Sequence, residues 1–505
     1  MKKIFLSVLA AGLLFTSCDM DKEPAGTLSD ENGIQSVTDC RNYRNGFYTN
    51  LRALTGGAYI GYSALQMDEF FGTILNGNRH GPLSNGVILS GDSDFEGIWG
   101  GCYGAIVSVN FFLEKVQGVY DNPRTTDEER AQLDRYIGEA HFARAYYMYY
   151  LMDHFCNSWG NVDPNAEGTG LCITTVYNPT ADNSTYIGRS SLADTFKFIE
   201  DEAKLAYDAM VEWEEHNGET IAPMAIYINS NVVKALQSRL ALLKGDWETA
   251  RTLANELITD GAYTLASRSN YSRMWTDDSN NEIIFMPFAS TSESAPSTGG
   301  LWISSDQNQA DYIPTPYVVE HLYASNDVRK DVFIGQRDLI YESAKFVSPV
   351  FIKFPGSAAL GGSVRLQNRP KPFRLSECYL IVAEASYELN DEPSANEALK
   401  TLRNARINRN RYTDYTGTEL RDQIRLERQR ELIGEGFRAS DLRRWNLGFN
   451  RTDNTYSGTY SAAANLVVRA GMISYEAGDY RFVWPIPSSE IQVNPQMKGQ
   501  QNPGY

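Results

Sequence analysis

The chain has 505 residues, 42% of them apolar, so it is long and apolar enough to bury a large core. Its formal net charge is −17, and it becomes −19 (44 basic against 63 acidic residues) without Lys2 and Lys3. A protein this acidic repels nucleic acid and anionic lipid surfaces, which excludes DNA and RNA as expected partners. The six cysteines form no C-x-x-C motif, so stability must rest on packing rather than on a disulfide framework.

The N-terminus has the pattern of an export signal. Residues 1–17 carry two lysines, an apolar run and then small polar residues. The apolar run is far shorter than the roughly 20 residues of a membrane span. Phe15-Thr16-Ser17-Cys18 is similar to a lipobox, so we expect acyl chains such as palmitate on Cys18 and an acidic tether over residues 18–33. The alternative is a cleaved secretory signal followed by an incidental cysteine.

A first helix is predicted over Ile34–Thr49, where Ser36 and Asp39 have the spacing of a capping box. Residues 55–98 then lose helical periodicity, and glycine recurs through them. An irregular stretch of this length inside a compact domain is usually functional.

Side chains suited to ligand binding gather in this irregular stretch. It places amides, a cation and carboxylates beside two aromatic rings. Planar polar groups satisfy sugar hydroxyls or peptide amides, and aromatic faces cover apolar ligand surface. We therefore predict ligand contacts from Asp68, Phe70, Phe71, Asn76, Asn78, Arg79, Asp92 and Asp94.

Evidence for catalysis is weak. Asp92 and Asp94 could form the carboxylate pair of a surface glycosidase, but a ligand-contacting surface is the simpler interpretation of an acidic, glycine-rich loop. The five histidines have no metal-ligand spacing, and no nucleotide-binding or nucleophile motif is present. We expect no enzyme activity, no metal and no cofactor.

Helical periodicity returns over Ile98–Val119, Asp127–His154 and Ser191–Trp213. Two helix–turn–helix hairpins follow, at residues 232–258 and 375–404, with small residues spaced as in tetratricopeptide-like hairpins. Because more than a hundred residues separate them, we expect a degenerate repeat set. The predicted fold class is mainly α, with long irregular loops and a few short strands.

The second irregular region covers residues 259–370. It contains two short predicted strands, Ile283–Met286 and Phe351–Phe354. Trp302 and Tyr312 stand in a loop between them and are further candidates for ligand contact.

The most charged stretch is Leu420–Trp445. Arginines and glutamates alternate at spacings of three and four among apolar residues, which predicts an ion-paired helix packed on a core. A catalytic carboxylate–arginine cluster is the alternative. So many charges among apolar residues imply partly buried pairs. At the C-terminus, prolines from Pro485 to Pro503 predict an extended tail lying over the body.

Three features together resemble the SusD/RagB family of outer-membrane nutrient-capturing lipoproteins. One is the lipobox-like segment with its acidic tether, and another is the Pro-Ile-Pro…Asn-Pro-Gly-Tyr ending. The third is the charged stretch, whose matching residues are Glu427, Arg428, Arg430, Glu431, Leu432, Glu435, Gly436, Arg438, Asp441, Leu442, Arg444 and Trp445.

The resemblance implies a single SusD-like domain over residues 34–505, lipid-anchored on the cell surface. It further implies a binding protein that delivers an oligosaccharide to a SusC-like, TonB-dependent β-barrel transporter. The segment LQMDEFFGTILNGN looks closer to RagB-type members, which bind oligopeptides. Glycan and peptide therefore both remain open as cargo.

Overall fold

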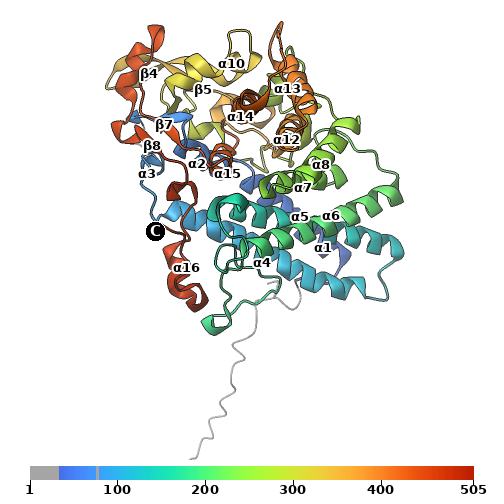
Figure 1. The fold of residues 1–505 in the computed structure, drawn as a ribbon. Helices are drawn as coiled ribbons and strands as arrows, with labels where there is room; N and C mark the ends of the chain where they lie inside the picture. The colour runs from blue at the N-terminus through green and yellow to red at the C-terminus, as the bar shows by residue number, and fades with distance from the viewer. Residues whose placement is uncertain (1–32, 76–78) are drawn as a thin grey trace, which may run out of the picture.

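The computed structural model describes residues 33–75 and 79–505. The predicted signal peptide, Cys18, all of the tether but its last residue, and the candidates Asn76 and Asn78 lie outside the described residues. The described chain is mainly helical, and its strands form four separate two-stranded antiparallel sheets (Figure 1). The predicted fold class is confirmed.

The helices and strands are numbered in chain order. The α-helices are α1 (Val37–Leu54), α2 (Ala58–Gln66), α3 (Gly81–Ser84), α4 (Ser93–Tyr120), α5 (Asp127–Phe155), α6 (Leu192–Asn217), α7 (Ser230–Lys244), α8 (Trp247–Thr259), α9 (Arg273–Thr276), α10 (Val328–Phe333), α11 (Gly362–Arg365), α12 (Leu375–Glu388), α13 (Glu392–Arg406), α14 (Gly417–Leu432), α15 (Arg438–Arg444) and α16 (Ser488–Val493). The strands are β1 (Phe70–Gly72), β2 (Ile283–Phe285), β3 (Tyr312–Pro314), β4 (Ile334–Tyr341), β5 (Ala344–Phe351), β6 (Phe373–Arg374), β7 (Phe449–Arg451) and β8 (Ile473–Tyr475).

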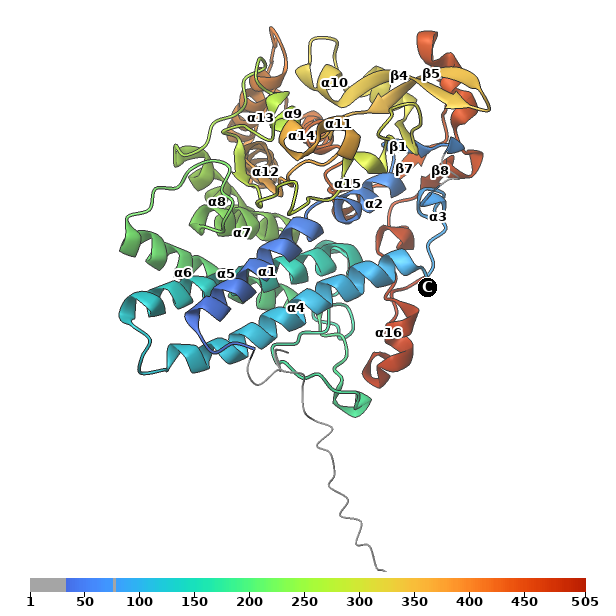
Figure 2. The same ribbon diagram turned by 180° about the vertical axis from the view of Figure 1, so that it is seen from behind.

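Four long helices, α1, α4, α5 and α6, pack together at one end of the molecule (Figure 2). The central helix α5 begins in a capping box, in which Thr126 and Glu129 each accept a hydrogen bond from the other's backbone N–H. Four helices were predicted in this region, and all four are present, with α4 beginning five residues earlier than expected: Ile34–Thr49, Ile98–Val119, Asp127–His154 and Ser191–Trp213.

The two predicted hairpins are present as α7–α8 and α12–α13, and α12 packs against α8 (Figure 1). At the first turn, Gly245 takes a φ of +79° and Asp246 caps α8. At the second, Asn390 takes a φ of +61° and Asp391 caps α13. Hairpins far apart in sequence therefore form one continuous stack.

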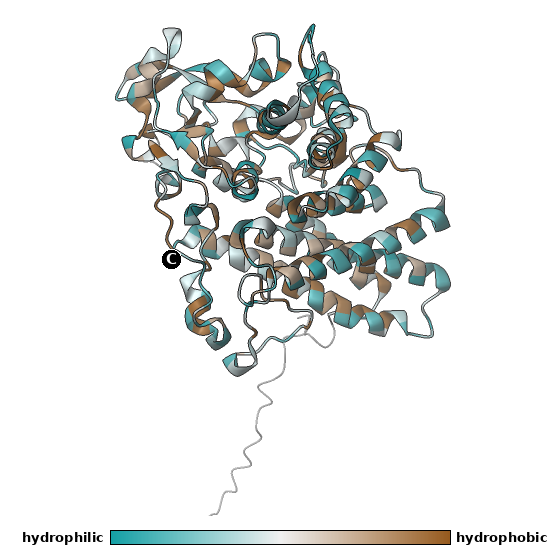
Figure 3. Cartoon of the chain, viewed as in Figure 1, coloured by the Kyte–Doolittle hydropathy of each residue, from teal (hydrophilic) through white to brown (hydrophobic). Residues whose placement is uncertain are grey.

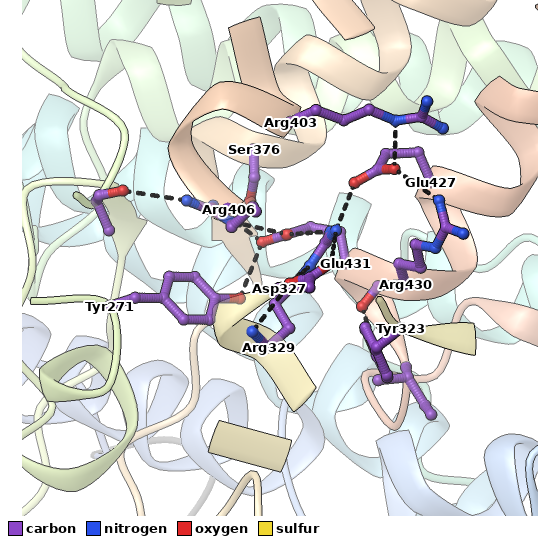
Figure 4. Close-up of polar contacts among 12 residues, drawn as sticks. Tyr271, Tyr323, Asp327, Arg329, Ser376, Arg403, Arg406, Glu427, Arg430 and Glu431 are labelled. Carbon is purple, nitrogen blue, oxygen red and sulfur yellow. Dashed lines mark hydrogen bonds and ion pairs between the residues drawn. The ribbon is translucent and has the colours of Figure 1, made fainter. Parts of the chain in front are cut away.

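The charged helix α14 supplies the centre of a buried ion-pair network (Figure 4). Glu431 accepts hydrogen bonds over 2.9–3.1 Å from three guanidinium groups, those of Arg329, Arg374 and Arg406. One turn earlier, Glu427 accepts a hydrogen bond from Arg403 at 2.8 Å. Burial opposes ionisation of Glu427, yet the surrounding guanidinium charges lower the pKa of its carboxyl to about 2. The predicted ion-paired scaffold helix is confirmed.

Two expectations about secondary structure are wrong. Residues 55–98 are not irregular throughout, since they contain α2, β1 and α3. Six of the nine residues of α2 are buried, so the segment lacks the alternation of apolar and polar residues that marks a surface helix. The predicted strand at Phe351–Phe354 overlaps only the last residue of β5, and the eight-residue hairpin partner β4 was not predicted.

The C-terminal tail lies over the body but is not wholly extended, because α16 forms between Pro487 and Pro495. The tail is held by Asn502, which donates hydrogen bonds to the carbonyls of Phe155 and Trp484 at 2.8 and 2.7 Å. The Asn502 Oδ1 also accepts a hydrogen bond from Arg189 at 2.9 Å.

Figure 3 shows polar and apolar residues interspersed along the helices rather than in long apolar runs. Within residues 33–75 and 79–505, no helix has both the length and the apolar character needed to cross a membrane. The five cysteines in this part of the chain are all buried and free, so none of them, including Cys156 and Cys172 at the two ends of one loop, forms a disulfide.

Candidate functional site

The structure brings three of the predicted aromatic residues together in one small sheet. Strand β1 pairs with β3, so that Phe70 lies opposite Pro314 and Phe71 opposite Ile313. Gly72 lies opposite Tyr312, and the hydroxyl of Tyr312 donates to the carbonyl of Arg79 at 2.6 Å.

Trp302 packs behind this sheet. Its ring centroid lies 5.6 Å from that of Phe70, 5.0 Å from that of Phe351 and 5.7 Å from that of Phe354. The four predicted aromatic side chains, Phe70, Phe71, Trp302 and Tyr312, are at most 1% exposed.

These four rings therefore do not form the ligand-facing platform expected from the sequence. Pairing of β1 with β3 and the aromatic cluster around Trp302 take their faces out of solvent. The four rings belong to the core and pack beneath the surface of the molecule.

Asp68 also has a structural partner. Its carboxylate accepts two hydrogen bonds from Arg438, at 2.8 and 2.6 Å, and its side chain is 14% exposed. Burial opposes ionisation, but the charge of Arg438 lowers the pKa of Asp68. This bidentate pair fixes the chain before β1 to the start of α15.

The two acidic residues before α4 do not face each other across a cleft. Asp92 caps the helix, with its Oδ1 accepting from the backbone N–H of Asp94 at 2.9 Å. The Asp94 carboxylate lies 2.9 Å from His80 Nδ1 and accepts from the Tyr62 hydroxyl at 3.1 Å. The hydrogen bond with His80 lowers the pKa of Asp94. Both carboxylates are thus committed to local structure.

Arg79 is the described candidate that lines a cavity. Its Nε donates to Asp311 at 2.7 Å, and its Nη2 donates to the Gly300 carbonyl at 2.8 Å. The Asp311 side chain is 2% exposed, whereas that of Arg79 is 51% exposed. One edge of the guanidinium is therefore fixed by the protein while the side chain reaches solvent.

The cavity has a volume of about 570 Å³ and opens to solvent between three segments of the chain. One is the residue Arg79, another is the turn around the 3-10 helix η4 (Gly299–Leu301), and the third is α11. Its lining residues are Arg79, Ser297, Gly300, Leu301, Ile303, Ser304, Ser305, Val364, Arg365 and Leu366. A cavity of this size is typical of small-ligand sites.

The turn and α11 are held against each other by short contacts. Ser297 Oγ donates to the Arg365 carbonyl at 2.8 Å, and the Gly299 N–H donates to the Leu366 carbonyl at 3.2 Å. A Cβ on Gly299 would lie 2.1 Å from the Phe354 carbonyl oxygen, so only glycine fits this approach. The shape of the cavity thus depends on backbone contacts between segments over 60 residues apart.

The sequence did not identify most of the lining. Five polar or exposed lining residues were missed: Ser297, Ser304, Ser305, Val364 and Arg365. The run of serines and glycines between Ser290 and Ser305 was the available signal, because small polar residues in an irregular segment often form a binding loop.

Two family models match separate parts of the chain. The SusD family model matches residues 338–505, and a model described as "Starch-binding associating with outer membrane" matches residues 66–227. None of the curated proteins matches the chain. The chain belongs to the SusD/RagB family.

Solved structures share the fold over nearly the whole chain. A SusD superfamily protein from Bacteroides thetaiotaomicron is 24% identical with a TM-score of 0.75, covering 93% of this chain and 100% of its own. A putative sugar binding protein from Bacteroides vulgatus is 22% identical with a TM-score of 0.76, covering 94% and 99%. A SusD-like carbohydrate binding protein from the same species is 20% identical with a TM-score of 0.73, covering 92% and 98%.

Proposed function

We propose that this protein captures oligosaccharides in the cavity lined by Arg79, the 297–305 turn and α11, and passes them to a transporter. The cavity itself carries the proposal. It offers serine hydroxyls, the half-exposed guanidinium of Arg79 and aliphatic side chains on a surface held by backbone contacts. Hydroxyl and guanidinium groups match the hydroxyl-rich edges of a sugar, and the aliphatic wall matches its C–H faces.

Family membership supports the same ligand class. The matching description names starch binding and outer-membrane association, and two structural neighbours are named as sugar or carbohydrate binding proteins. Of the sequence candidates, Arg79 contacts the ligand in this proposal, and Asn76 and Asn78, its near neighbours in the chain, remain predicted contacts.

The anchor and the partner follow from the sequence. Cys18 after the export signal would carry the lipid, and the acidic tether would place the folded body outside the outer membrane. A SusC-like, TonB-dependent barrel would take the ligand from this protein, so the chain needs no energy source of its own. We propose a binding role without catalysis, because Asp92 and Asp94 are engaged in capping and hydrogen bonding.

Native mass spectrometry of the protein extracted from its own cells tests the ligand class. We expect adducts separated by the mass of hexose or related sugar units. A heterogeneous set of peptide masses would instead establish the RagB-type alternative and reject the glycan proposal. If the extracted protein carries no acyl chains on Cys18, the lipid anchor alone is rejected.

A blocking variant tests the site. Ser305 is exposed at the cavity, so Ser305→Trp fills the opening without entering the core. We expect at least a ten-fold loss of oligosaccharide affinity by calorimetry. Ser461→Trp, at an exposed serine that does not line the cavity, is the matched control and should bind as the wild type does. Unchanged binding by Ser305→Trp would place the ligand elsewhere.

A further inference from the structure

The cavity differs in charge from the protein that carries it. The chain has a formal net charge of −17, yet the lining contains two arginines and no aspartate or glutamate. A cavity of one charge sign concentrates ligands of the opposite sign. This difference indicates what kind of oligosaccharide the proposed binding site selects.

The first arginine, Arg79, is held in place by hydrogen bonds to the protein that leave part of its guanidinium free. Asp311 and the Gly300 carbonyl accept from its Nε and Nη2. Among the described residues, Nη1 has no hydrogen-bond acceptor, and the side chain is 51% exposed. A guanidinium fixed on one side leaves the two N–H groups of Nη1 free to donate charge-assisted hydrogen bonds to a carboxylate or sulfate oxygen.

The second arginine, Arg365, has no acidic partner within ion-pair distance in the described part of the chain. Its Nη1 reaches only the Thr291 carbonyl, at a long 3.4 Å. Its stem lies over Gly361, where a Cβ would come within 2.8 Å of Arg365 Cδ. Gly361 has a φ of +101°, so a glycine both permits this backbone and leaves room for the stem.

Both arginines are anchored to the same turn. Arg79 donates to the carbonyl of Gly300, while the carbonyl of Arg365 accepts from Ser297 three residues earlier. Arg79 and Arg365 therefore lie at the same opening, although they come from segments far apart in the sequence. Two acidic residues adjoin this opening without lining it: the buried Asp311, which pairs with Arg79, and the exposed Asp306, which accepts from Ser304 Oγ at 2.5 Å. Arg365 has no such ion pair in the described part of the chain, so its charge is not offset.

The cavity also lacks an aromatic face. All ten lining residues are non-aromatic, and the neighbouring Trp302 and Tyr312 are buried. A neutral sugar gains much of its affinity by stacking its C–H face on an aromatic ring. Leu301, Ile303 and Val364, the last of them 77% exposed, provide only an aliphatic wall. Affinity here must come from charge-assisted hydrogen bonds.

We propose that the cavity selects acidic oligosaccharides, whose carboxylate or sulfate ester groups are bound by Arg79 and Arg365. This inference rests on the proposed function, because it specifies the ligand of the same cavity. The serine hydroxyls donate hydrogen bonds to the sugar hydroxyls or accept them.

Matched ligand pairs separate charge from sugar shape. The full mature chain is titrated with tetragalacturonate and its fully methyl-esterified form, and with a sulfated galactan tetrasaccharide and its desulfated form. We expect one of the acidic ligands to bind at least ten-fold more tightly than its neutral counterpart, as two charge-assisted hydrogen bonds imply. The pair that shows the difference identifies carboxylate or sulfate as the recognised group.

Substitution ties the difference to the cavity. Arg365→Gln should reduce affinity for that acidic ligand about ten-fold and change affinity for its neutral form less than two-fold. Arg124→Gln removes the same charge at an exposed position that does not line the cavity and should leave both affinities unchanged. Folding of each variant is checked by its thermal unfolding midpoint.

Each remaining outcome is decisive. If neutral and acidic forms bind equally, or if Arg365→Gln has no selective effect, the inference is overturned and glycan capture stands. If only the neutral forms bind, the inference is likewise overturned and glycan capture stands. If neither form of either pair binds while peptides do, both the inference and the proposed function are rejected.

Discussion

The buried network at α14 and the cavity beside α11 use the same chemical groups for opposite purposes. In the network, the carboxylate of Glu431 meets three guanidinium groups, and none of the four side chains is more than 1% exposed. At the cavity, Arg79 shares one buried carboxylate and remains half exposed. Burial therefore separates arginines that hold the fold together from arginines that are available to a ligand.

Removal of the central carboxylate should give the largest effect. Glu431→Gln leaves three buried guanidinium groups without their shared anion, so we expect a loss of about 3–5 kcal/mol in the free energy of unfolding. Chemical denaturation measures it. Glu419→Gln, an exposed residue in the first turn of the same helix, is the control and should change stability by less than about 0.5 kcal/mol. A small loss in Glu431→Gln would mean that the network contributes little.

The same network predicts sensitivity to acid. The pKa of Glu427 is held at about 2 in the folded protein, below the roughly 4.3 of an unfolded glutamate. Its contribution is therefore complete above pH 4.5 and is lost as the pH falls toward 2, an amount of about 3 kcal/mol. The unfolding midpoint in denaturant, measured from pH 5 to pH 2, should fall steeply. A flat profile over this range would contradict the assigned pairing.

Glu69 gives the opposite dependence on pH. It is 1% exposed, and neither carboxylate oxygen has a hydrogen-bond partner in the described chain. Burial and then the charge of Asp68 raise its pKa to about 8. The folded protein then keeps a proton that the unfolded chain releases near pH 4.5, so this group lowers stability as the pH rises from about 4.5 to about 8. Glu69→Gln should exceed the wild type by at least about 2 kcal/mol at pH 9 and match it at pH 4.

An equal advantage of Glu69→Gln at both pH values would show that packing, not ionisation, separates the two proteins. Denaturant unfolding at the two pH values gives the comparison directly. Glu342→Gln, at an exposed turn, serves as the control without pH dependence.

Loss of the Arg79 side chain should destabilise the protein less than a change in the buried network but more than a change at the exposed Arg365. Arg79→Gln leaves the buried carboxylate of Asp311 without its cation, and Asp311 Oδ1 already lacks a hydrogen bond in the described chain. We expect a loss of about 1–2 kcal/mol in the free energy of unfolding. Arg79→Lys keeps the charge and should recover part of that loss. Stability equal to that of the wild type in Arg79→Gln would show that the pair is purely a surface contact.

The acidic side of the network was predictable from sequence because Glu427 and Glu431 lie on one helix at regular spacing, whereas their partners Arg329, Arg374 and Arg406 come from α10, β6 and α13. Glu427 and Glu431 are four residues apart, and the surrounding arginines and apolar residues give the same periodicity. Capped, periodic helices and the two hairpins were predictable for the same reason. Helix α2 was not, since it is largely buried and shows no polar face.

The cavity was not predictable because it forms between distant segments. Whether Phe70 is a binding platform or a core residue depends on the pairing of β1 with β3, about 240 residues later. Ser297 and Arg365 likewise meet only through a contact between an irregular turn and α11. Residue types alone gave Arg79 as a candidate, but they could not separate exposed from buried aromatic rings.

Arg365 should show the smallest effect on stability, which makes it the sharpest contrast with the network. Its guanidinium lies in solvent and has no acidic partner within ion-pair distance in the described part of the chain, so Arg365→Gln should alter the free energy of unfolding by less than about 0.5 kcal/mol. Arg406→Gln removes the same group from the buried network and should cost several kcal/mol, about 3–5. Chemical denaturation of the two variants side by side measures the difference. If Arg365→Gln destabilised the protein as strongly as Arg406→Gln, the rim arginine would be part of the scaffold, and burial would no longer distinguish the two roles.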